Sequence, residues 1–515
     1  MYNAFLQRKI LILLCVIIIA GVFVRLYRFD NPIGDWHSWR QADTSAVSRS
    51  FVTSGFDLLH PRFEDLSNIP SGKDNPNGYR FVEFPLYNIA QAGLFKLIGG
   101  FTLEEWGRLV TIFASSLATL FLYLIVSRHS NRTIGLLTAF FYAFIPYNIY
   151  YGRTILPDPS MVTAILGGIY FFDRYVGVIA RSETTKSKIP EWGQSDKDLR
   201  LPRSFFARND GLFWFFLALL LTVSAFLLKP YALFFTLPML VLAYNQWGLR
   251  LLAKWQLWVF AIISVLPLVL WRQWITQYPE GIPVNAWLLN GNGIRFRPAF
   301  FKWILYERLT KLISGYLGIF VFLFGLYWAR KLKEWLFFAS FLVSSLLYVV
   351  VFATGNVQHD YYQILIMPSV AIFFAIGSYF LYSWSVRKIP LGKVILVVSI
   401  GGLFWFGWYQ VKDYFNINNP DMVIAGQAVD QLTPKNAKII AFIPGQAGDT
   451  SFLYQTQRQG WPSFEKPIPE MVQMGASYLV LLDPTKQDLG FSKTYRIVKA
   501  TPQYVIFKLT TVIHE

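Results

Sequence analysis

Long apolar segments alternate with short polar ones along most of this chain. A helix rises about 1.5 Å per residue, so about 20 apolar residues cross the roughly 30 Å hydrocarbon core of a bilayer. Lys229-Pro230 interrupts the apolar run 211–247, which we therefore divide into two spans, since one helix of that length would be about 55 Å long. The pattern predicts eleven spans, near residues 9–26, 107–128, 133–152, 159–178, 211–228, 231–247, 257–273, 312–329, 335–353, 362–384 and 393–410.

Basic residues collect in the loops on one side of these spans. The positive-inside rule then predicts a cytoplasmic N-terminus, with loop 27–106 and the C-terminus on the outer side. Residues 84–100 are apolar but are interrupted by Gln91 and Lys96, so we expect a helix in the outer interface rather than a further span. The basic loops contain Arg8 and Lys9, Arg128 and Arg132, the stretch 181–208, Arg250 and Lys254, Arg330, Lys331 and Lys333, and Arg387 and Lys388.

The last hundred residues have a different pattern. A helical pattern at 421–432 precedes short runs of β-branched and aromatic residues that Pro, Gly and Asp separate. We expect a membrane domain over 1–410 and a small extracytoplasmic α/β domain over 411–515. No glycine-rich loop opens a helix there, so we predict no nucleotide site. The predicted strands are 438–443, 478–482, 495–498 and 504–508.

The composition agrees with an α-helical polytopic membrane protein. Hydrophobic residues make up 54% of the 515 residues and charged residues only 15%, whereas soluble domains carry about 25% charged residues. The net charge of +17 comes from the short loops, so we expect it to face anionic membrane lipids rather than nucleic acid. The one cysteine, Cys15, lies in the first span, which excludes a disulfide framework and a cysteine metal site.

Three polar clusters follow apolar segments and fall on the same predicted side of the membrane. A charged residue at the bilayer centre costs about 2.5–3.5 kcal/mol, so such groups rarely gather without a function. We therefore expect one polar site at the outer membrane face. The clusters are His37, Arg40 and Asp43, then Arg153 and Asp158, then His359 and Asp360.

Two carboxylates in these clusters are candidates for acid–base chemistry. A helical pattern begins near Ser38, which puts Arg40 and Asp43 one turn apart on one face. Asp43 there can act as general base for a hydroxyl, or it can be half of a surface ion pair. Asp158 can be a second carboxylate or a metal ligand in the same cavity, or simply the N-cap of the next span.

Cations at the same level can hold a phosphate. Arg40 and Arg153 offer bidentate contacts, and Lys229 offers a point charge at the turn between two spans. Lys229 can also be an ordinary lysine that extends its ammonium group toward the interface.

The remaining candidates are four residues at the same outer boundary. His37, His359 and Asp360 are expected to reach the site as substrate-binding groups, and Glu83 lies just before Phe84-Pro85. Glu83, Asp158 and His359 are candidate ligands for a divalent metal, although their spacing matches no fixed ligand motif. The cofactor is therefore left open.

Several of these segments resemble a known group of proteins. The chain is similar over residues 5–410 to membrane glycosyltransferases of the GT-C fold. It resembles in particular the protein O-mannosyltransferase and lipid A aminoarabinose transferase superfamily, especially its RgtA/B/C/D-like branch. The segments that carry the resemblance are the long first outer loop, Trp39-Arg-Gln-Ala-Asp-Thr44, Glu83-Phe-Pro-Leu-Tyr87, Arg153-Thr-Ile-Leu-Pro-Asp-Pro159 and the outer tail.

The resemblance implies an enzyme of the bacterial inner membrane that takes a sugar from a polyprenyl-phosphate-linked donor. An acid of the first loop deprotonates a lipid, glycan or protein acceptor, which attacks the anomeric carbon with inversion. Basic side chains stabilise the departing lipid phosphate. Asp158 matches its counterpart in the family directly, and Glu83 matches an acid before a proline in the aminoarabinose enzymes.

The first loop departs from the family pattern. Better-known relatives have an Asp-Glu pair where this chain has Arg40-Gln41. The acids left for the role of base are Asp43, one turn later, and Asp35, five residues earlier. We favour Asp43, because the helix carries it on the same face as Arg40.

Two other functions fit the same sequence less well. A transporter or flippase of lipid-linked saccharide is the main alternative, but it is expected to place ionisable groups near the midplane, often in two related halves. Here the polar groups gather at one boundary and no halves repeat. A non-catalytic membrane scaffold whose tail binds partners is the third.

Overall fold

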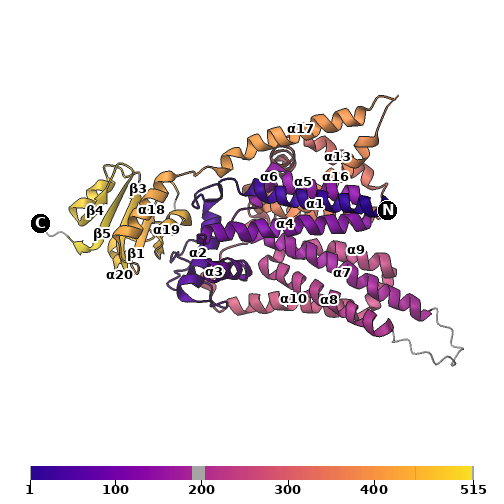
Figure 1. Cartoon of the computed structure of the whole chain (residues 1–515). Helices are drawn as coiled ribbons and strands as arrows, with labels where there is room; N and C mark the ends of the chain where they lie inside the picture. The colour runs from indigo at the N-terminus through magenta and orange to yellow at the C-terminus, as the bar shows by residue number, and fades with distance from the viewer. Residues whose placement is uncertain (1, 188–202, 387, 447, 513–515) are drawn as a thin grey trace.

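The computed structural model describes residues 2–187, 203–386, 388–446 and 448–512 of the chain. Part of the basic loop 181–208 lies outside these residues. A bundle of helices makes up most of the molecule, and a small sheet domain lies at one end of it (Figure 1). The N-terminus lies at the opposite end from the sheet domain.

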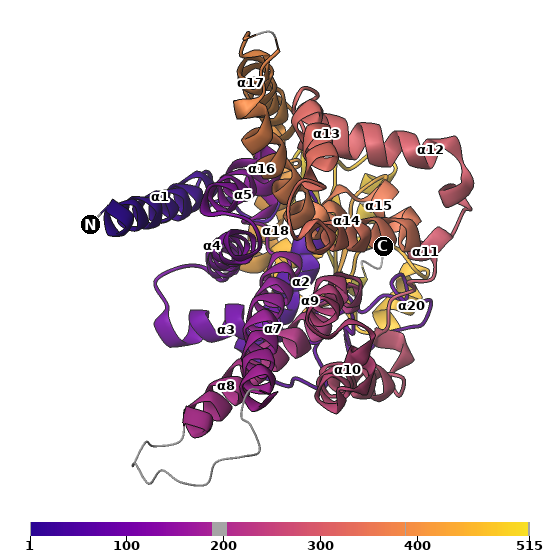
Figure 2. The same ribbon diagram turned by 90° about the vertical axis from the view of Figure 1, so that its right-hand side faces the viewer.

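The bundle is built from long helices and several short ones. Viewed along the bundle, α1, α8 and α17 project from its periphery (Figure 2). The long helices are α1 (Tyr2–Arg25), α4 (Leu103–His129), α5 (Arg132–Phe144), α7 (Asp158–Ser187), α8 (Arg203–Leu228), α9 (Leu237–Trp247), α10 (Trp255–Ile275), α13 (Gly318–Ala329), α14 (Trp335–Val351), α16 (Met367–Ser383) and α17 (Leu391–Val411). The short ones are α6 (Pro146–Tyr151), η1 (Pro230–Thr236), η2 (Gly248–Ala253), α11 (Trp287–Asn290), α12 (Pro298–Phe301), η5 (Lys302–Ile313), α15 (Ala353–Gln358), η6 (Asp360–Ile366) and η7 (Lys412–Phe415).

Each of the eleven predicted spans overlaps at least one helix, but not all of these helices are long straight spans. Among the described residues, seven segments are long and apolar enough to cross a bilayer, and one bent pair would make an eighth. In that pair, η5 and α13 meet at an angle of 113°. The seven segments are Leu103–His129, Asp158–Ala180, Gly211–Leu228, Pro230–Ala253, Trp255–Ile275, Asp360–Ser383 and Leu391–Leu432.

Prolines explain two of the breaks. The helix predicted over 133–152 stops at Phe144, and α6 begins at Pro146. Lys229-Pro230 separates α8 from η1, so the structure confirms two spans over 211–247. The helix predicted within 84–100 is α3 (Leu86–Ile98), whose 13 residues extend about 20 Å and are too few to cross a bilayer.

The sheet domain contains the four predicted strands and one short strand that the sequence pattern did not show. The sheet order is β2-β1-β3-β5-β4; β1 pairs in parallel with β2 and β3, and β5 is antiparallel to β3 and β4. The strands are β1 (Lys438–Phe442), β2 (Gly460–Trp461), β3 (Ala476–Leu482), β4 (Tyr495–Ala500) and β5 (Tyr504–Val512).

Both faces of this sheet are covered by helices. Alternate residues of β1 point to opposite faces, so Ile439 packs with Met422 of α18 while Ile440 packs with Met471 of α20. Two small apolar cores result, one on each face. The helices of the domain are α18 (Pro420–Leu432), α19 (Thr450–Thr456) and α20 (Ile468–Gln473).

The sheet domain docks on the first loop of the bundle. Backbone amides of Leu66 and Gly460 donate to the carbonyls of Gly460 and Glu64 at 2.8 and 2.9 Å, so the loop continues the sheet beyond β2. Next to this contact, α19 packs against α2 (Ser38–Ser54) of the first loop. The sheet domain therefore contacts the helix on which the candidate base lies.

One buried arginine is expected to hold this domain together. Arg458 donates to the carbonyls of Asp430, Thr433 and Pro434 at 2.8–3.1 Å, and its side chain is fully buried. An Arg458→Met variant leaves these carbonyls without donors, so we expect a loss of about 3 kcal/mol in the stability of the domain. Hydrogen exchange of the strand amides in the full-length protein measures this loss.

A lysine that pairs with the same acid provides the control. Lys435 contacts Asp430 at 2.5 Å, but its side chain is 73% exposed. Lys435→Met is expected to change the stability by no more than about 0.5 kcal/mol. Equal protection of the strands in both variants would contradict the role given to Arg458.

Candidate functional site

A polar helix lies buried beside the bundle. Helix α2 has no apolar stripe, yet Arg40, Gln41, Asp43 and Ser48 on it are all buried. Buried polar groups need partners, so neighbouring elements must supply polar contacts to this helix. Those contacts define the candidate site.

The candidate base Asp43 lies between two arginines. Arg80 of the first loop forms an ion pair with Asp43 Oδ2. The guanidinium of Arg40 lies 3.8 Å from the same oxygen, across one turn of α2. The hydroxyl of Thr450, from α19 of the sheet domain, donates to Asp43 Oδ1 at 3.3 Å. Asp43 thus meets groups from the first loop and from the sheet domain.

The contacts continue from Arg40 to the spans. Arg40 donates to Glu83 Oε1 at 2.5 Å, and the ammonium of Lys229 lies 2.5 Å from that oxygen. Lys229 also lies 3.6 Å from Asp158 Oδ2, at the start of α7. Basic and acidic residues alternate along this series, which we call the charge chain: Arg80, Asp43, Arg40, Glu83, Lys229 and Asp158.

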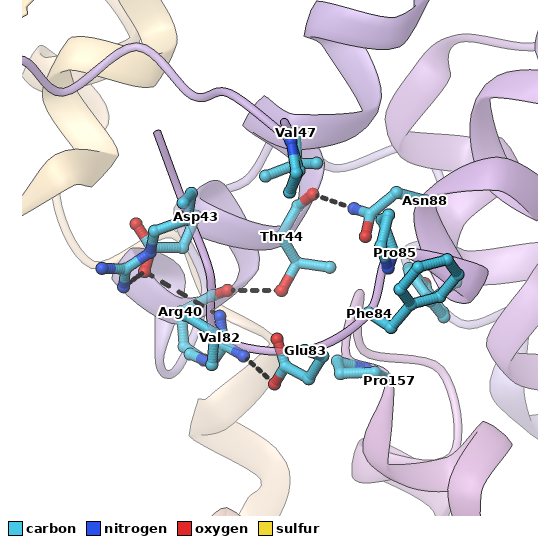
Figure 3. A pocket seen from close by; sticks show the side chains of 13 residues that line it. Arg40, Asp43, Thr44, Val47, Val82, Glu83, Phe84, Pro85, Asn88 and Pro157 are labelled. Atoms are coloured by element: carbon cyan, nitrogen blue, oxygen red, sulfur yellow. Dashed lines mark hydrogen bonds and ion pairs between the residues drawn. The ribbon is translucent and has the colours of Figure 1, made fainter. Parts of the chain in front are cut away.

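A small cavity, of about 20 Å³, lies beside the part of the charge chain that runs from Arg80 to Glu83 (Figure 3). In it Arg40 reaches Glu83, and the side chain of Asn88 points at Thr44, whose carbonyl accepts its amide at 2.6 Å. Two structural elements of the bundle meet here, the first loop and the turn before α7. The charged part of the wall is formed by Arg40, Asp43, Arg80 and Glu83.

The charge chain fixes the ionisation of Glu83. Burial alone would raise the pKa of this carboxyl, but the neighbouring Arg40 and Lys229 outweigh burial and hold the pKa at about 2. The same pairing raises the pKa of Arg40 above its ordinary value, although burial opposes the shift. Both partners are therefore charged at neutral pH.

This shift predicts how stability depends on pH. The pKa of Glu83 is lower in the folded protein than the ordinary value of 4.5, so its stabilising effect is complete above about pH 4.5 and is lost as the pH falls toward 2. The melting temperature of a Glu83→Gln variant should lie below that of the unsubstituted protein by a constant amount from pH 5 to 8. The difference should shrink below pH 4.5, and a difference that grows there would contradict the pairing.

Asp360 lies in a second buried cluster. Its carboxylate accepts hydrogen bonds from side chains of the first loop, α6 and η7, and Arg308 lies 4.0 Å away. This ring of donors leaves the carboxylate fully paired. The donors are Trp36 at 3.1 Å, His37 at 2.5 Å, Tyr151 at 2.6 Å and Tyr414 at 2.7 Å.

His359 lies among aromatic rings next to that cluster. Its ring centroid is 5.8 Å from that of His37 and 5.6 Å from that of Trp39. Burial, together with repulsion from His37, lowers the pKa of His359 to about 4. The imidazole is therefore neutral at physiological pH.

The other two candidates, Asp35 and Arg153, are not among the residues that line the cavity. Asp35 accepts a hydrogen bond from Gln41 at 2.6 Å and lies 4.0 Å from Arg153. Arg153 donates to the carbonyls of Tyr27 and Arg28 at 2.7 and 3.0 Å. In the structure the contacts of these two residues hold the start of the first loop against the bundle.

The three candidate metal ligands do not come together. Among the described residues, no three His, Cys, Asp or Glu side chains are arranged to hold a metal ion. Glu83 and Asp158 both contact Lys229, whereas His359 lies in the aromatic cluster. The ammonium of Lys229 thus takes the position between the two acids.

Three residues near the site were missed from the sequence. The first is Arg80, three residues before Glu83 in the sequence. The second is Arg272, at the end of α10, whose guanidinium lies 3.5 Å from the carbonyl of Val82. Arg272 lies at the outer end of the predicted span 257–273, and this position could have identified it from the sequence as a candidate. Thr450 lies in a segment of no regular pattern, and nothing in the sequence links it to Asp43.

Comparisons with known proteins agree with the fold. Residues 82–181, which include Glu83 and Asp158, match the family model of dolichyl-phosphate-mannose-protein mannosyltransferases. Sequence comparison alone finds no match among curated proteins.

Solved structures match nearly the whole chain. ArnT from Cupriavidus metallidurans bound to undecaprenyl phosphate matches with a TM-score of 0.60 at 13% identity, over 96% of this chain and 97% of that one. The Archaeoglobus fulgidus oligosaccharyltransferase in complex with Zn and sulfate matches with a TM-score of 0.55 at 12% identity, over 96% of this chain and 73% of that one. The structural matches confirm the predicted GT-C fold.

Proposed function

We propose that this protein transfers a sugar from a polyprenyl-phosphate-linked donor to an acceptor at the outer face of the bacterial inner membrane, with inversion at the anomeric carbon. The observation that carries the proposal is the charge chain, in which cations and carboxylates alternate and four of the six residues line one cavity. The similarity to a structure that holds undecaprenyl phosphate supports the choice of a lipid-linked donor.

The cations of the charge chain provide a site for the donor phosphate. Arg40 and Arg80 line the cavity, and Lys229 contacts both Glu83 and Asp158. Guanidinium groups bind phosphate oxygens in a bidentate manner. They also stabilise the charge that develops on the leaving phosphate in the transition state.

Asp43 is the proposed general base. The acceptor hydroxyl loses its proton to the carboxylate, its oxygen bonds to the anomeric carbon, and the bond from that carbon to the phosphate oxygen breaks. A phosphate that binds Arg40 and Arg80 would draw these arginines from Asp43. The carboxylate oxygens would then be free to accept the proton.

Glu83 and Asp158 hold Lys229 in place in this proposal. Asp158 Oδ2 is buried, lies 3.6 Å from the ammonium and makes no hydrogen bond within the described part of the chain. This oxygen can therefore accept a hydrogen bond from a hydroxyl group of the donor sugar. We propose for Asp360, His37 and His359 a structural role beside the cavity.

Proteoliposomes loaded with polyprenyl-phosphate-linked sugars test the proposal. We expect release of free polyprenyl phosphate and a product in which the anomeric configuration is inverted, both detected by mass spectrometry and NMR. Movement of intact donor between leaflets without cleavage would instead indicate a flippase and would contradict transfer.

A further inference from the structure

A second cavity, of about 320 Å³, lies between α2 and the sheet domain. It is distinct from the charge chain, none of whose residues line it. Residues from the first loop form one wall, and residues at the start of α18 and before α19 form the other. The cavity therefore exists only where the sheet domain docks.

Two tryptophans on the first-loop wall are held in fixed positions. The ring of Trp36 stacks on Tyr414, with centroids 4.8 Å apart, and its Nε1 donates to Asp360 at 3.1 Å. Even so, Trp36 remains 38% exposed. Trp39 packs against His359, with centroids 5.6 Å apart. Such a wall offers flat apolar surfaces that need no ordering when a ligand binds.

The opposite wall offers polar groups with unused hydrogen-bonding capacity. The side chain of Gln446 makes no hydrogen bond within the described part of the chain. Asp449 accepts from the amide of Ser451 with one oxygen, at 2.7 Å, which leaves the other oxygen for a ligand. The side-chain carbonyl of Asn419 accepts from the backbone amide of Met422 at 3.1 Å and so caps α18, which leaves the side-chain amide group of Asn419 for a ligand.

This combination of groups indicates the chemistry of the ligand. Amide and carboxylate groups match hydroxyls, which both donate and accept hydrogen bonds, while indole rings match the apolar C–H face of a pyranose. No arginine or lysine lines this cavity, which disfavours a phosphate. We infer that the cavity binds a neutral saccharide, the acceptor of the transfer reaction.

The position of the cavity relative to the proposed base supports an acceptor site. Trp39 and Asp43 lie one turn apart on α2, and Thr450, the residue after Asp449, donates to Asp43 at 3.3 Å. Burial raises the pKa of Asp449, and the charge of Asp43 adds to this effect. The saccharide would thus lie beside the proposed base. This inference rests on the proposed function.

Binding of neutral disaccharides tests the inference without requiring transfer. Full-length protein in lipid nanodiscs is mixed with maltose, cellobiose, lactose and N,N′-diacetylchitobiose, and saturation-transfer-difference NMR detects the bound sugar. We expect at least one disaccharide to bind. The Gln446→Ala/Asp449→Asn double variant should weaken binding by about tenfold, which corresponds to one or two lost hydrogen bonds.

Gln473→Ala is the matched control, because Gln473 is exposed at the end of α20 in the same domain. It should bind disaccharide like the unsubstituted protein. Binding of no disaccharide, or equal binding by the double variant, would overturn the inference.

Kinetics separate this inference from the proposed function. In the transfer assay, the double variant should raise the KM for the acceptor by about tenfold and leave the KM for the donor unchanged. Transfer with an unchanged acceptor KM would overturn the inference alone, as would a rise in the donor KM only. Disaccharide binding without any transfer would instead contradict the proposed function while leaving a saccharide site.

Discussion

An Asp43→Asn variant is expected to lose sugar transfer by about 10²–10⁴-fold in kcat, the usual contribution of a general base. Asparagine keeps the shape of the side chain and can still accept the hydrogen bond from Thr450. It cannot take up the proton of the acceptor hydroxyl. Because Arg40 and Lys229 remain, the KM for the donor should change by less than about threefold. Transfer assays under saturating donor measure both constants.

Asp35→Asn is the matched control for this variant. Asp35 is the other first-loop acid that the sequence offers as a base, and it is equally buried, but it contacts Gln41 and Arg153 rather than the cavity. We expect this variant to retain kcat within about threefold. If Asp35→Asn abolished transfer and Asp43→Asn did not, the base would have been assigned to the wrong acid. Melting temperatures of both variants exclude a loss of folded protein.

Lys229→Met should have the second large effect, on both stability and donor binding. It leaves Glu83 and Asp158 buried without the cation that they share, which is expected to cost about 3–5 kcal/mol. It also removes a proposed phosphate contact, so the donor KM should rise by at least about tenfold. Thermal unfolding in detergent and donor titration measure the two effects.

A second substitution separates these two effects. The Lys229→Met/Asp158→Asn double variant also removes the charge of Asp158, which loses its ion pair with Lys229, so it should recover part of the lost stability. It should not recover transfer, because the phosphate contact is still missing. Recovery of full activity together with stability would show that Lys229 serves the fold alone.

Hydrophobic pattern alone predicted the helices of the bundle well. The thickness of the bilayer sets the length of an apolar segment that crosses it, so the predicted spans 107–128 and 257–273 correspond to α4 and α10. Proline at 146 and the 113° bend before α13 limited the prediction, since neither changes the hydropathy of its segment. The two-residue strand β2 is too short to give a period-two pattern.

The candidate site was predictable only in part. Charges at one predicted boundary identified the residues of the charge chain other than Arg80. Sequence does not show where a side chain points, so it did not show that Arg153 donates to loop carbonyls or that Asp360 is enclosed by donors. Contacts from α19 to Asp43 join residues about four hundred positions apart, and no local pattern encodes them.

A structure of the full-length protein with undecaprenyl phosphate in nanodiscs, determined by cryo-electron microscopy, tests most directly whether the charge chain receives the lipid phosphate. We predict phosphate density in the cavity, within hydrogen-bonding distance of Arg40 and Lys229, with the prenyl chain leaving toward the bilayer. Phosphate density at any other place, with Arg40 and Lys229 still paired to carboxylates alone, would contradict the assignment of the charge chain as the phosphate site.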